Sequence, residues 1–271
     1  MNYEVHDPPP ELKDFIKCFW ILEDEKKELQ VRQRIIPDGC MEMIFHFGDL
    51  YQQYFEDGSS IIQPRSFIYG QISSFIEIAP TGTTGIIAAR FLPDGLAPLL
   101  DIPVVSLENK AVGIEKIFGK EGKLLESLII NSTNNEERKK ILQFFLLQRI
   151  VNPATINKIT KSCLETIFLA HGKIGISELA KKTAINKRKL ERTFITAVGM
   201  SPKQLSKIIR LQNTISMLNK KQYNSLTELA YENGYYDQAH FIKDFREFTG
   251  ISPKSFFEEN LQLAKLFIAN N

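Results

Sequence analysis

Residues 176–202 read ISELAKKTAINKRKLERTFITAVGMSP, and residues 226–253 read LTELAYENGYYDQAHFIKDFREFTGISP. The second stretch repeats the first after fifty residues. Both begin with a short Glu-Leu-Ala segment and end in Gly-x-Ser-Pro, and the later copy has one extra residue in its turn. Two copies are too few for a solenoid, which needs at least three stacked repeats. The pattern therefore predicts a tandem pair of small helical modules.

Each copy has the local signals of a helix-turn-helix. Residues whose side chains cap helices stand where four helices are expected to begin, at Ser177, Asn186, Ser225 and Asp237. Gly199 follows the second helix of the first copy, where glycine adopts a left-handed backbone at low cost. Gly234 lies in the turn of the second copy. Each Ser-Pro pair predicts one more helix, because serine caps well and proline fits the first helical position.

The helix that is expected to begin at Pro202 connects the two modules. Residues 202–218 are mostly apolar at helical spacing and would span about 25 Å as a helix. A rigid connector of that length can hold two helices near the ~34 Å spacing of successive major-groove turns. One chain could therefore contact a bipartite DNA site without a partner subunit.

The outward face of the second helix in each copy carries side chains that suit DNA recognition. Arginine pairs with guanine, lysine with phosphates and glutamine with adenine, and an alanine methyl can contact thymine. The alternative interpretation is an ordinary solvated helix face, and the occurrence of two such helices in the basic half of the chain argues against it. The candidate DNA-binding residues are Asn186, Lys187, Arg188, Glu191 and Arg192 in the first copy, and Asp237, Gln238, Ala239, His240 and Lys243 in the second.

Charge divides the chain into two halves. Residues 1–150 contain 16 Lys and Arg against 22 Asp and Glu, whereas residues 151–271 contain 18 against 10. This asymmetry favours a polyanionic partner for the basic half alone. The sequence has no apolar run long enough for a membrane span and no signal-like amino terminus, and its three cysteines are too scattered for a disulfide framework. We therefore expect a cytoplasmic protein without a membrane partner.

The amino-terminal half is expected to be rich in strands. In residues 41–47, apolar side chains alternate with Glu42, Ile44 and His46, as in a strand with two different faces. Further short runs bounded by Gly, Pro, Asp or Ser predict a small antiparallel barrel or sandwich. The fold class is therefore α+β, with a small antiparallel β-barrel and helices followed by an all-α tandem helix-turn-helix domain.

Two helices are expected between these parts, in residues 123–130 and 136–151. The apolar surface of the second is wider than the ~100° stripe of a one-sided helix. This helix is therefore either sandwiched within its own domain or covered by the second subunit of a homodimer. Asn152-Pro153 breaks the pattern. We divide the chain into a sensor-type β-domain (1–105), a helical linking or dimerising region (106–152) and a DNA-binding domain (153–260).

The repeated half resembles the AraC/XylS family of bacterial transcription regulators. The matching positions include Leu190-Glu191-Arg192-Thr193-Phe194, Arg210-Leu211, Ala230-Tyr231-Glu232-Asn233-Gly234-Tyr235 and both Gly-x-Ser-Pro segments. The resemblance implies seven helices, two recognition helices that bind double-stranded DNA, and promoter activation through contact with RNA polymerase. Asn186 stands where a serine is commoner in the family, and Lys243 replaces the more usual arginine.

The amino-terminal half is similar to an uncharacterised module found ahead of such DNA-binding domains. The similar stretches are residues 37–45, 64–70 and 89–95. This second resemblance implies a cupin-like barrel without pointing to a particular ligand.

Three polar residues of the amino-terminal half are candidates for a small-molecule effector site. Glu42 and His46 share a strand face, and Arg90 lies in another predicted strand. These side chains either line a pocket, form a structural Glu42–Arg90 pair, or face water. His, Cys and acidic residues lack metal-ligand spacing here, so we predict no metal, cofactor or catalytic residue.

We therefore expect a regulator and no enzyme. A fused alkyl-acceptor repair enzyme would need a cluster of closely spaced cysteines, which three scattered ones do not supply. The remaining alternative is a constitutive DNA-binding protein whose β-domain serves only for dimerisation. A ligand-induced change in DNA affinity would separate this alternative from effector control.

Overall fold

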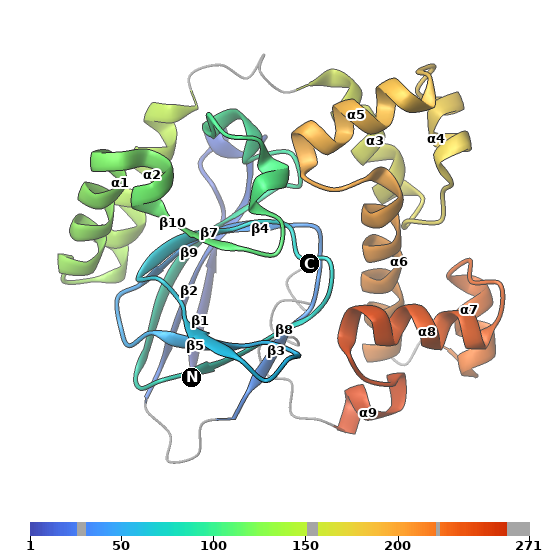
Figure 1. Cartoon of the computed structure of the whole chain (residues 1–271), viewed down its shortest axis with the longest axis horizontal. Coiled ribbons are helices and arrows are strands. Elements are labelled where there is room, and N and C mark those ends of the chain that lie inside the picture. The colour runs from blue at the N-terminus through green and yellow to red at the C-terminus, as the bar shows by residue number, and fades with distance from the viewer. Residues whose placement is uncertain (26–30, 151–156, 221–222, 259–271) are drawn as a thin grey trace.

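The computed structural model describes residues 1–25, 31–150, 157–220 and 223–258. The fold is α+β, as predicted. Two β-sheets and a pair of helices come from the amino-terminal half, and a group of helices comes from the carboxy-terminal half (Figure 1). None of the described helices has the length and apolar composition of a membrane span.

The amino-terminal strands form two antiparallel sheets. The larger sheet has the order β1-β2-β9-β4-β7-β10, and the smaller has the order β3-β8-β5-β6. The last strand extends the larger sheet past residue 105, where the predicted β-domain ended. The strands are β1 (Asn2–His6), β2 (Ile16–Asp24), β3 (Gln33–Ile35), β4 (Met41–His46), β5 (Tyr51–Tyr54), β6 (Ser60–Ile62), β7 (Ser66–Tyr69), β8 (Ile76–Pro80), β9 (Thr84–Phe91) and β10 (Ala111–Gly113).

The strands do not close into the single barrel that the sequence favoured. The larger sheet ends in β1 and β10 and the smaller in β3 and β6, and no ladder joins these edges among the described residues. Closure requires one continuous ladder of hydrogen bonds, whereas the chain changes sheets between β4 and β5. The result is two separate sheets that face each other, which corrects the predicted barrel.

Strand β4 separates a core covered by helices from the space between the sheets. Its side chains alternate between the two sides, as the two-residue period predicted. The helix side contacts α1 (Ile114–Asn131) and α2 (Asn135–Arg149), which pack on the larger sheet. The side chains on the helix side are Met41, Met43 and Phe45, and those on the other side are Glu42, Ile44 and His46.

Helix α2 corresponds to the predicted helix 136–151, although Val151 and the break at Asn152-Pro153 lie outside the described residues. Its Leu142 and Leu146 are buried against the sheet. One side of the helix pair nevertheless stays open in the single chain. The exposed apolar side chains on this side are Leu124, Leu128, Phe144 and Leu147.

The carboxy-terminal helices pack around one apolar core that includes both repeated modules and the connecting helix. The described residues contain seven helices in this part, the number that the family resemblance implied. They are α3 (Lys158–Leu169), α4 (Ile176–Lys182), α5 (Lys187–Val198), α6 (Pro202–Asn219), α7 (Leu226–Glu232), α8 (Gln238–Thr249) and α9 (Pro253–Glu258).

Most of the predicted helix caps are present. The side chains of Asn186, Ser225 and Asp237 accept hydrogen bonds from the first turns of α5, α7 and α8. The predicted cap at Ser177 is wrong. Helix α4 begins at Ile176, its capping position is Gly175, two residues before Ser177, and it has no side-chain cap. The neighbouring Ile174 is buried in the core, which fixes the entry of the chain ahead of Ser177.

A glycine follows the second helix of each module, α5 and α8, where the repeated Gly-x-Ser-Pro segments begin. Gly199 and Gly250 follow α5 and α8 in left-handed conformations, with φ of 83° and 75°. Ser201 and Gln204 form a reciprocal capping box at the start of α6, with Pro202 as its first residue. The connector α6 therefore begins at Pro202, as predicted, and ends at Asn219, one residue past the predicted end at Leu218.

Candidate nucleic-acid interface and buried cavity

The second helix of the first module, α5, carries its cations on an open surface. Lys187, Arg188, Glu191 and Arg192 are all exposed, as is the capping residue Asn186. Within the described residues, no hydrogen bond or ion pair ties the side chains of the three cations to the rest of the protein. Their charge is therefore available to an external polyanion.

The second helix of the second module, α8, has a more ordered polar surface. Ala239 and Lys243 are exposed, whereas Asp237, Gln238 and His240 are half-buried. Thr227 Oγ1 donates a hydrogen bond to Gln238 Oε1 at 2.7 Å, which leaves the amide group of Gln238 to donate outward. The backbone N–H of Tyr236 donates to His240 Nδ1 at 3.4 Å.

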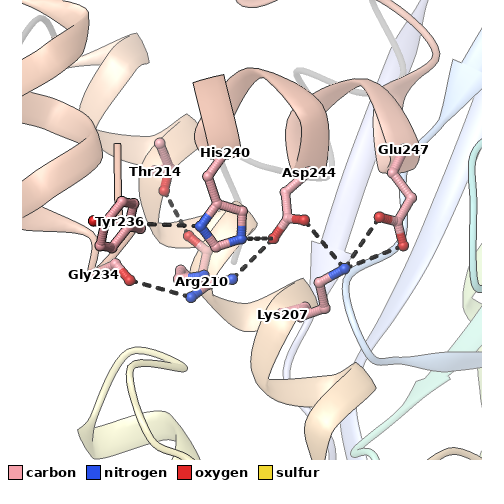
Figure 2. A network of polar contacts seen from close by, with 8 residues as sticks. All are labelled: Lys207, Arg210, Thr214, Gly234, Tyr236, His240, Asp244 and Glu247. Carbon is pink, nitrogen blue, oxygen red and sulfur yellow. Dashed lines mark hydrogen bonds and ion pairs between the residues drawn. The ribbon is translucent and has the colours of Figure 1, made fainter. Parts of the chain in front are cut away.

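A polar network fixes α8 to the connector α6, as Figure 2 shows. Asp244 is almost fully buried and pairs with Arg210 at 2.9 Å and Lys207 at 3.2 Å, while His240 Nε2 lies 3.8 Å from the same carboxylate. Lys207 also pairs with Glu247 at 3.1 Å. The sequence indicated His240 through its place on the helix and did not predict this network. The only sequence signal for the network was Asp244, an acidic residue between the core residues Phe241 and Phe245.

Helices α5 and α8 both have their carboxyl ends against the amino-terminal half. A Cβ atom on Gly199 would lie 3.0 Å from Val104, and one on Gly250 would lie 2.5 Å from the ring of Phe75. The carbonyl of Thr249 accepts a hydrogen bond from Arg34 at 3.1 Å. The amino-terminal ends of α5 and α8 therefore lie on the other side, next to α4 and α7 and remote from the sheets (Figure 1).

Arg192 has a mixed position. It is exposed, but together with Thr193 and Thr196 it lines a groove whose opposite wall is formed by the short 3-10 helices η2 (Ala97–Leu99) and η3 (Val104–Leu107) and the residues around them. The first turn of α5 is therefore open, whereas Arg192 and Thr193 in the second turn and Thr196 in the third adjoin the amino-terminal half.

Glu42, His46 and Arg90 line one cavity between the two sheets. The cavity has a volume of about 90 Å³ and mostly apolar walls, with isoleucines from both sheets. Arg90 is 5% exposed and pairs with Asp38, and its second guanidinium nitrogen lies 3.5 Å from Glu42. The Glu42–Arg90 pair and the cavity are thus both present, although from the sequence they were alternatives. No local sequence pattern predicted that Asp38 pairs with Arg90.

The carboxyl group of Glu42 is poorly compensated. Its side chain is 20% accessible, and this accessible part faces the cavity. Burial raises the pKa of Glu42 to about 7, and the hydrogen bond from Trp20 Nε1 at 3.1 Å and the nearby Lys17 offset this rise only in part.

His46 lies at the other end of the same strand face and is 1% exposed. Burial and the nearby Arg65 guanidinium lower the pKa of His46 to about 4, so the ring is neutral at pH 7. Neither ring nitrogen has a hydrogen-bond partner of normal geometry in the described residues. The amide of Gln63 adjoins the ring without completing such a bond. In the same described residues, no cluster of His, Cys, Asp and Glu has the composition of a metal site.

Comparisons with known proteins match two separate parts of the chain. Residues 4–113 match the family described as a domain of unknown function (DUF6597), and residues 179–259 match a family described as a helix-turn-helix domain. An uncharacterised HTH-type transcriptional regulator of Haemophilus influenzae is 25% identical over 133 residues, which cover 47% of this chain and 44% of that protein. The match thus spans less than half the length of this relative.

The chain is also similar to solved structures. ToxT from Vibrio cholerae has 13% identity and a TM-score of 0.47, with coverage of 89% of this chain and 98% of ToxT. A fatty-acid-bound ToxT has 11% identity and a TM-score of 0.43, with 94% coverage of both chains. The carboxy-terminal domain of AraT, a response regulator from Geobacillus stearothermophilus, has 20% identity and a TM-score of 0.36, with coverage of 38% and 87%.

The tandem modules and their connector define a helix-turn-helix protein with a separate β-sheet domain at its amino terminus. Within that class, the chain resembles the AraC family, with residues 179–259 matching the helix-turn-helix family and residues 4–113 matching DUF6597.

Proposed function

We propose that this protein is a sequence-specific DNA-binding transcription regulator that reads two successive major-groove segments with α5 and α8. The observation that carries the proposal is the common orientation of the two helices. Both have their carboxyl ends against the amino-terminal half and their amino-terminal turns on the remote side. Helices that enter the major groove contact bases mainly through those first turns.

The side chains divide between two roles in this proposal. Arg188, Arg192, Gln238 and Ala239 face bases, and Lys187 and Lys243 hold phosphates. Glu191 accepts a hydrogen bond from a cytosine amino group. Asn186 and Asp237 cap their helices and adjoin the backbone of the duplex, with His240 next to them.

Three further parts of the proposal concern partners. Family resemblance supports activation through RNA polymerase. The open apolar side of α1 and α2, with Phe144 at 62% exposure, supports a homodimer formed through this helix pair. The cavity that contains Glu42, His46 and Arg90 supports control by a small-molecule effector.

DNA selection followed by footprinting tests the main proposal. The full chain is used to enrich sites from a random pool of duplexes, and the enriched site is then mapped. We expect two protected major-groove segments about one helical turn apart. The Arg188→Ala variant should fail to enrich the same sequence, whereas Lys116→Ala, a change on the exposed surface of α1, should enrich it normally. Absence of any enriched sequence, or protection of one segment only, would overturn the proposal.

Constitutive DNA binding, with an amino-terminal domain that only dimerises, is the second candidate. The exposed apolar side of the helix pair favours it as much as it favours a controlled dimer. A change in DNA affinity on addition of a ligand excludes this candidate.

A further inference from the structure

One segment, residues 36–40, lines the cavity and also contacts the connector α6. Ile36, Asp38 and Cys40 line the cavity. The carbonyl of Pro37 accepts a hydrogen bond from Gln212 of α6 at 2.6 Å. A Cβ on Gly39 would lie 2.6 Å from Leu205 of α6.

The segment is stiff enough to transmit a displacement. Ile36 is buried in the same apolar core as the helix-turn-helix modules. The carboxylate of Asp38 pairs with Arg90 and also accepts a hydrogen bond from the backbone N–H of Cys40 at 2.9 Å. Gln71 donates to the carbonyl of Gly39 at 2.9 Å. Because these contacts leave little freedom inside the segment, a shift of Asp38 in the cavity moves the surface on which α6 rests.

The cavity has a polar group at each end and an apolar middle. Glu42 stands opposite Arg90 in the β4–β9 register, Ile44 stands opposite Ala88, and His46 stands opposite Ile86. At the rise of a strand, the Cα atoms of Glu42 and His46 are about 13 Å apart. One small polar group cannot contact both ends, so a ligand that satisfies both must be elongated.

The charged end favours a cation over an anion. Two carboxylates, those of Asp38 and Glu42, share the single guanidinium of Arg90 among the cavity-lining residues. A ligand carboxylate would meet Glu42 in a poorly solvated space, whereas an ammonium group would complete its charge. Trp20 lines this end as well, and the faces of aromatic rings attract cations.

The other end favours an uncharged polar group. His46 is neutral, and its two ring nitrogens are unpartnered and buried in the cavity wall. A neutral imidazole donates one hydrogen bond and accepts another. A hydroxyl or amide can exchange both with it, whereas a second ammonium group would be repelled by the nearby Arg65 guanidinium.

We propose that the cavity binds an elongated, mostly apolar amine, with its ammonium group at Glu42 and a hydroxyl or amide at His46, and that this ligand acts on α6 through residues 36–40. The ligand competes with Arg90 for the carboxylates of Asp38 and Glu42 and so shifts the segment. Because α5 and α8 both pack on α6, the shift changes the placement of one recognition helix relative to the other. The second half of this proposal rests on the proposed function, since DNA affinity is its output.

Calorimetry on the full chain tests the ligand class without DNA. The probes are 5-aminopentanol, which has its two polar groups at opposite ends and a length that suits the cavity, 5-hydroxypentanoate and pentylamine. We expect the aminopentanol to bind about tenfold more tightly than the hydroxypentanoate. Equal or tighter binding of the hydroxypentanoate, or absence of binding by either amine, would overturn the assignment.

Two variants locate the probe in the cavity. Glu42→Gln should remove the preference for the amine, whereas Glu56→Gln, which changes an exposed carboxylate outside the cavity, should keep it. His46→Leu should weaken the binding of aminopentanol but leave that of pentylamine unchanged, which separates a lost contact from a misfolded domain. An unchanged ratio in His46→Leu would contradict the assignment of the uncharged end.

DNA binding in the presence of aminopentanol tests the coupling. We expect the affinity for an enriched site to change about fivefold or more, the lower end of typical couplings. Gln212→Ala should still bind aminopentanol and lose most of this change, whereas Asn219→Ala, at the exposed end of α6, should keep it. Amine binding without a change in DNA affinity overturns the coupling alone. A chain that enriches no DNA sequence overturns the proposed function, and the calorimetric result then still decides the ligand class.

Discussion

The two halves of this protein place their functional charges in opposite ways. In the amino-terminal half, Arg90 is 5% exposed and shares its charge with Asp38 and Glu42 inside a cavity. In the carboxy-terminal half, Lys187, Arg188 and Arg192 project from α5 into solvent. Buried charges interact strongly and are little screened by salt, whereas exposed charges act at long range and are screened. The cavity should therefore respond to pH, and the helix surface to ionic strength.

The largest expected effect comes from removal of the buried cation. Arg90→Met leaves Asp38 and Glu42 in the cavity without their shared partner, and breaking a buried ion pair in this way costs about 3–5 kcal/mol of unfolding free energy. Urea unfolding followed by circular dichroism measures the loss. Lys116→Met is the matched exposed control and should change stability by less than about 0.5 kcal/mol. Equal effects of the two variants would remove the distinction between buried and exposed charge.

The next largest effect is expected in the pH dependence of stability, because Glu42 and His46 in the cavity have shifted pKa values. The pKa of Glu42 is raised from 4.5 to about 7, so the stability it contributes in acid is lost as the pH rises through that range. The pKa of His46 is lowered from 6.5 to about 4, so the stability it contributes near neutrality is lost as the pH falls through that range. The two trends oppose each other and should partly cancel in the wild type.

Single variants should expose each trend. Relative to the wild type, Glu42→Gln should lose stability toward acid, below about pH 7, and His46→Gln should lose it toward alkali, above about pH 4. Each trend is at most about 3 kcal/mol over its range. Melting temperatures measured between these limits test the signs. Parallel profiles for the two variants would show that the groups do not titrate as described.

On the exposed surface of α5, the larger effect on DNA binding is expected from Arg188. Arg188→Ala should cost about 1–3 kcal/mol of binding to an enriched DNA site and relax the preference at one base pair. Protein stability should stay within about 0.5 kcal/mol of the wild type, because the side chain is exposed. Competition binding against sites changed one base pair at a time measures both effects. A loss that is the same on random DNA would assign Arg188 to a phosphate.

The smallest effect is expected from Lys187. Lys187→Ala should weaken binding to all duplexes alike and lower the slope of log affinity against log salt by about one. Affinity measured over a series of salt concentrations gives this slope. Glu42→Gln is the contrasting variant and should leave the slope unchanged. A slope unaffected by Lys187→Ala would contradict a phosphate contact.

Local sequence patterns predicted the parts of both sites that depend on one element. The two-residue period of β4 was sufficient to place Glu42 and His46 on one face, and cap signals were sufficient to locate α5 and α8. Contacts between distant segments were not predictable, because no local period encodes them. The pairing of Arg90 with Asp38 and that of Asp244 with Arg210 both depend on how separate elements pack. Ser177 failed as a cap because burial of Ile174 overrode a local preference.

The alternating sides of β4 have a consequence for how this protein can evolve. Substitution of Ile44 or His46 alters what the space between the sheets accepts, while Met43 and Phe45 continue to hold the helix pair in place. Descendants of one ancestral gene can therefore acquire new chemical preferences by single changes on one side of a strand, with the scaffold inherited intact.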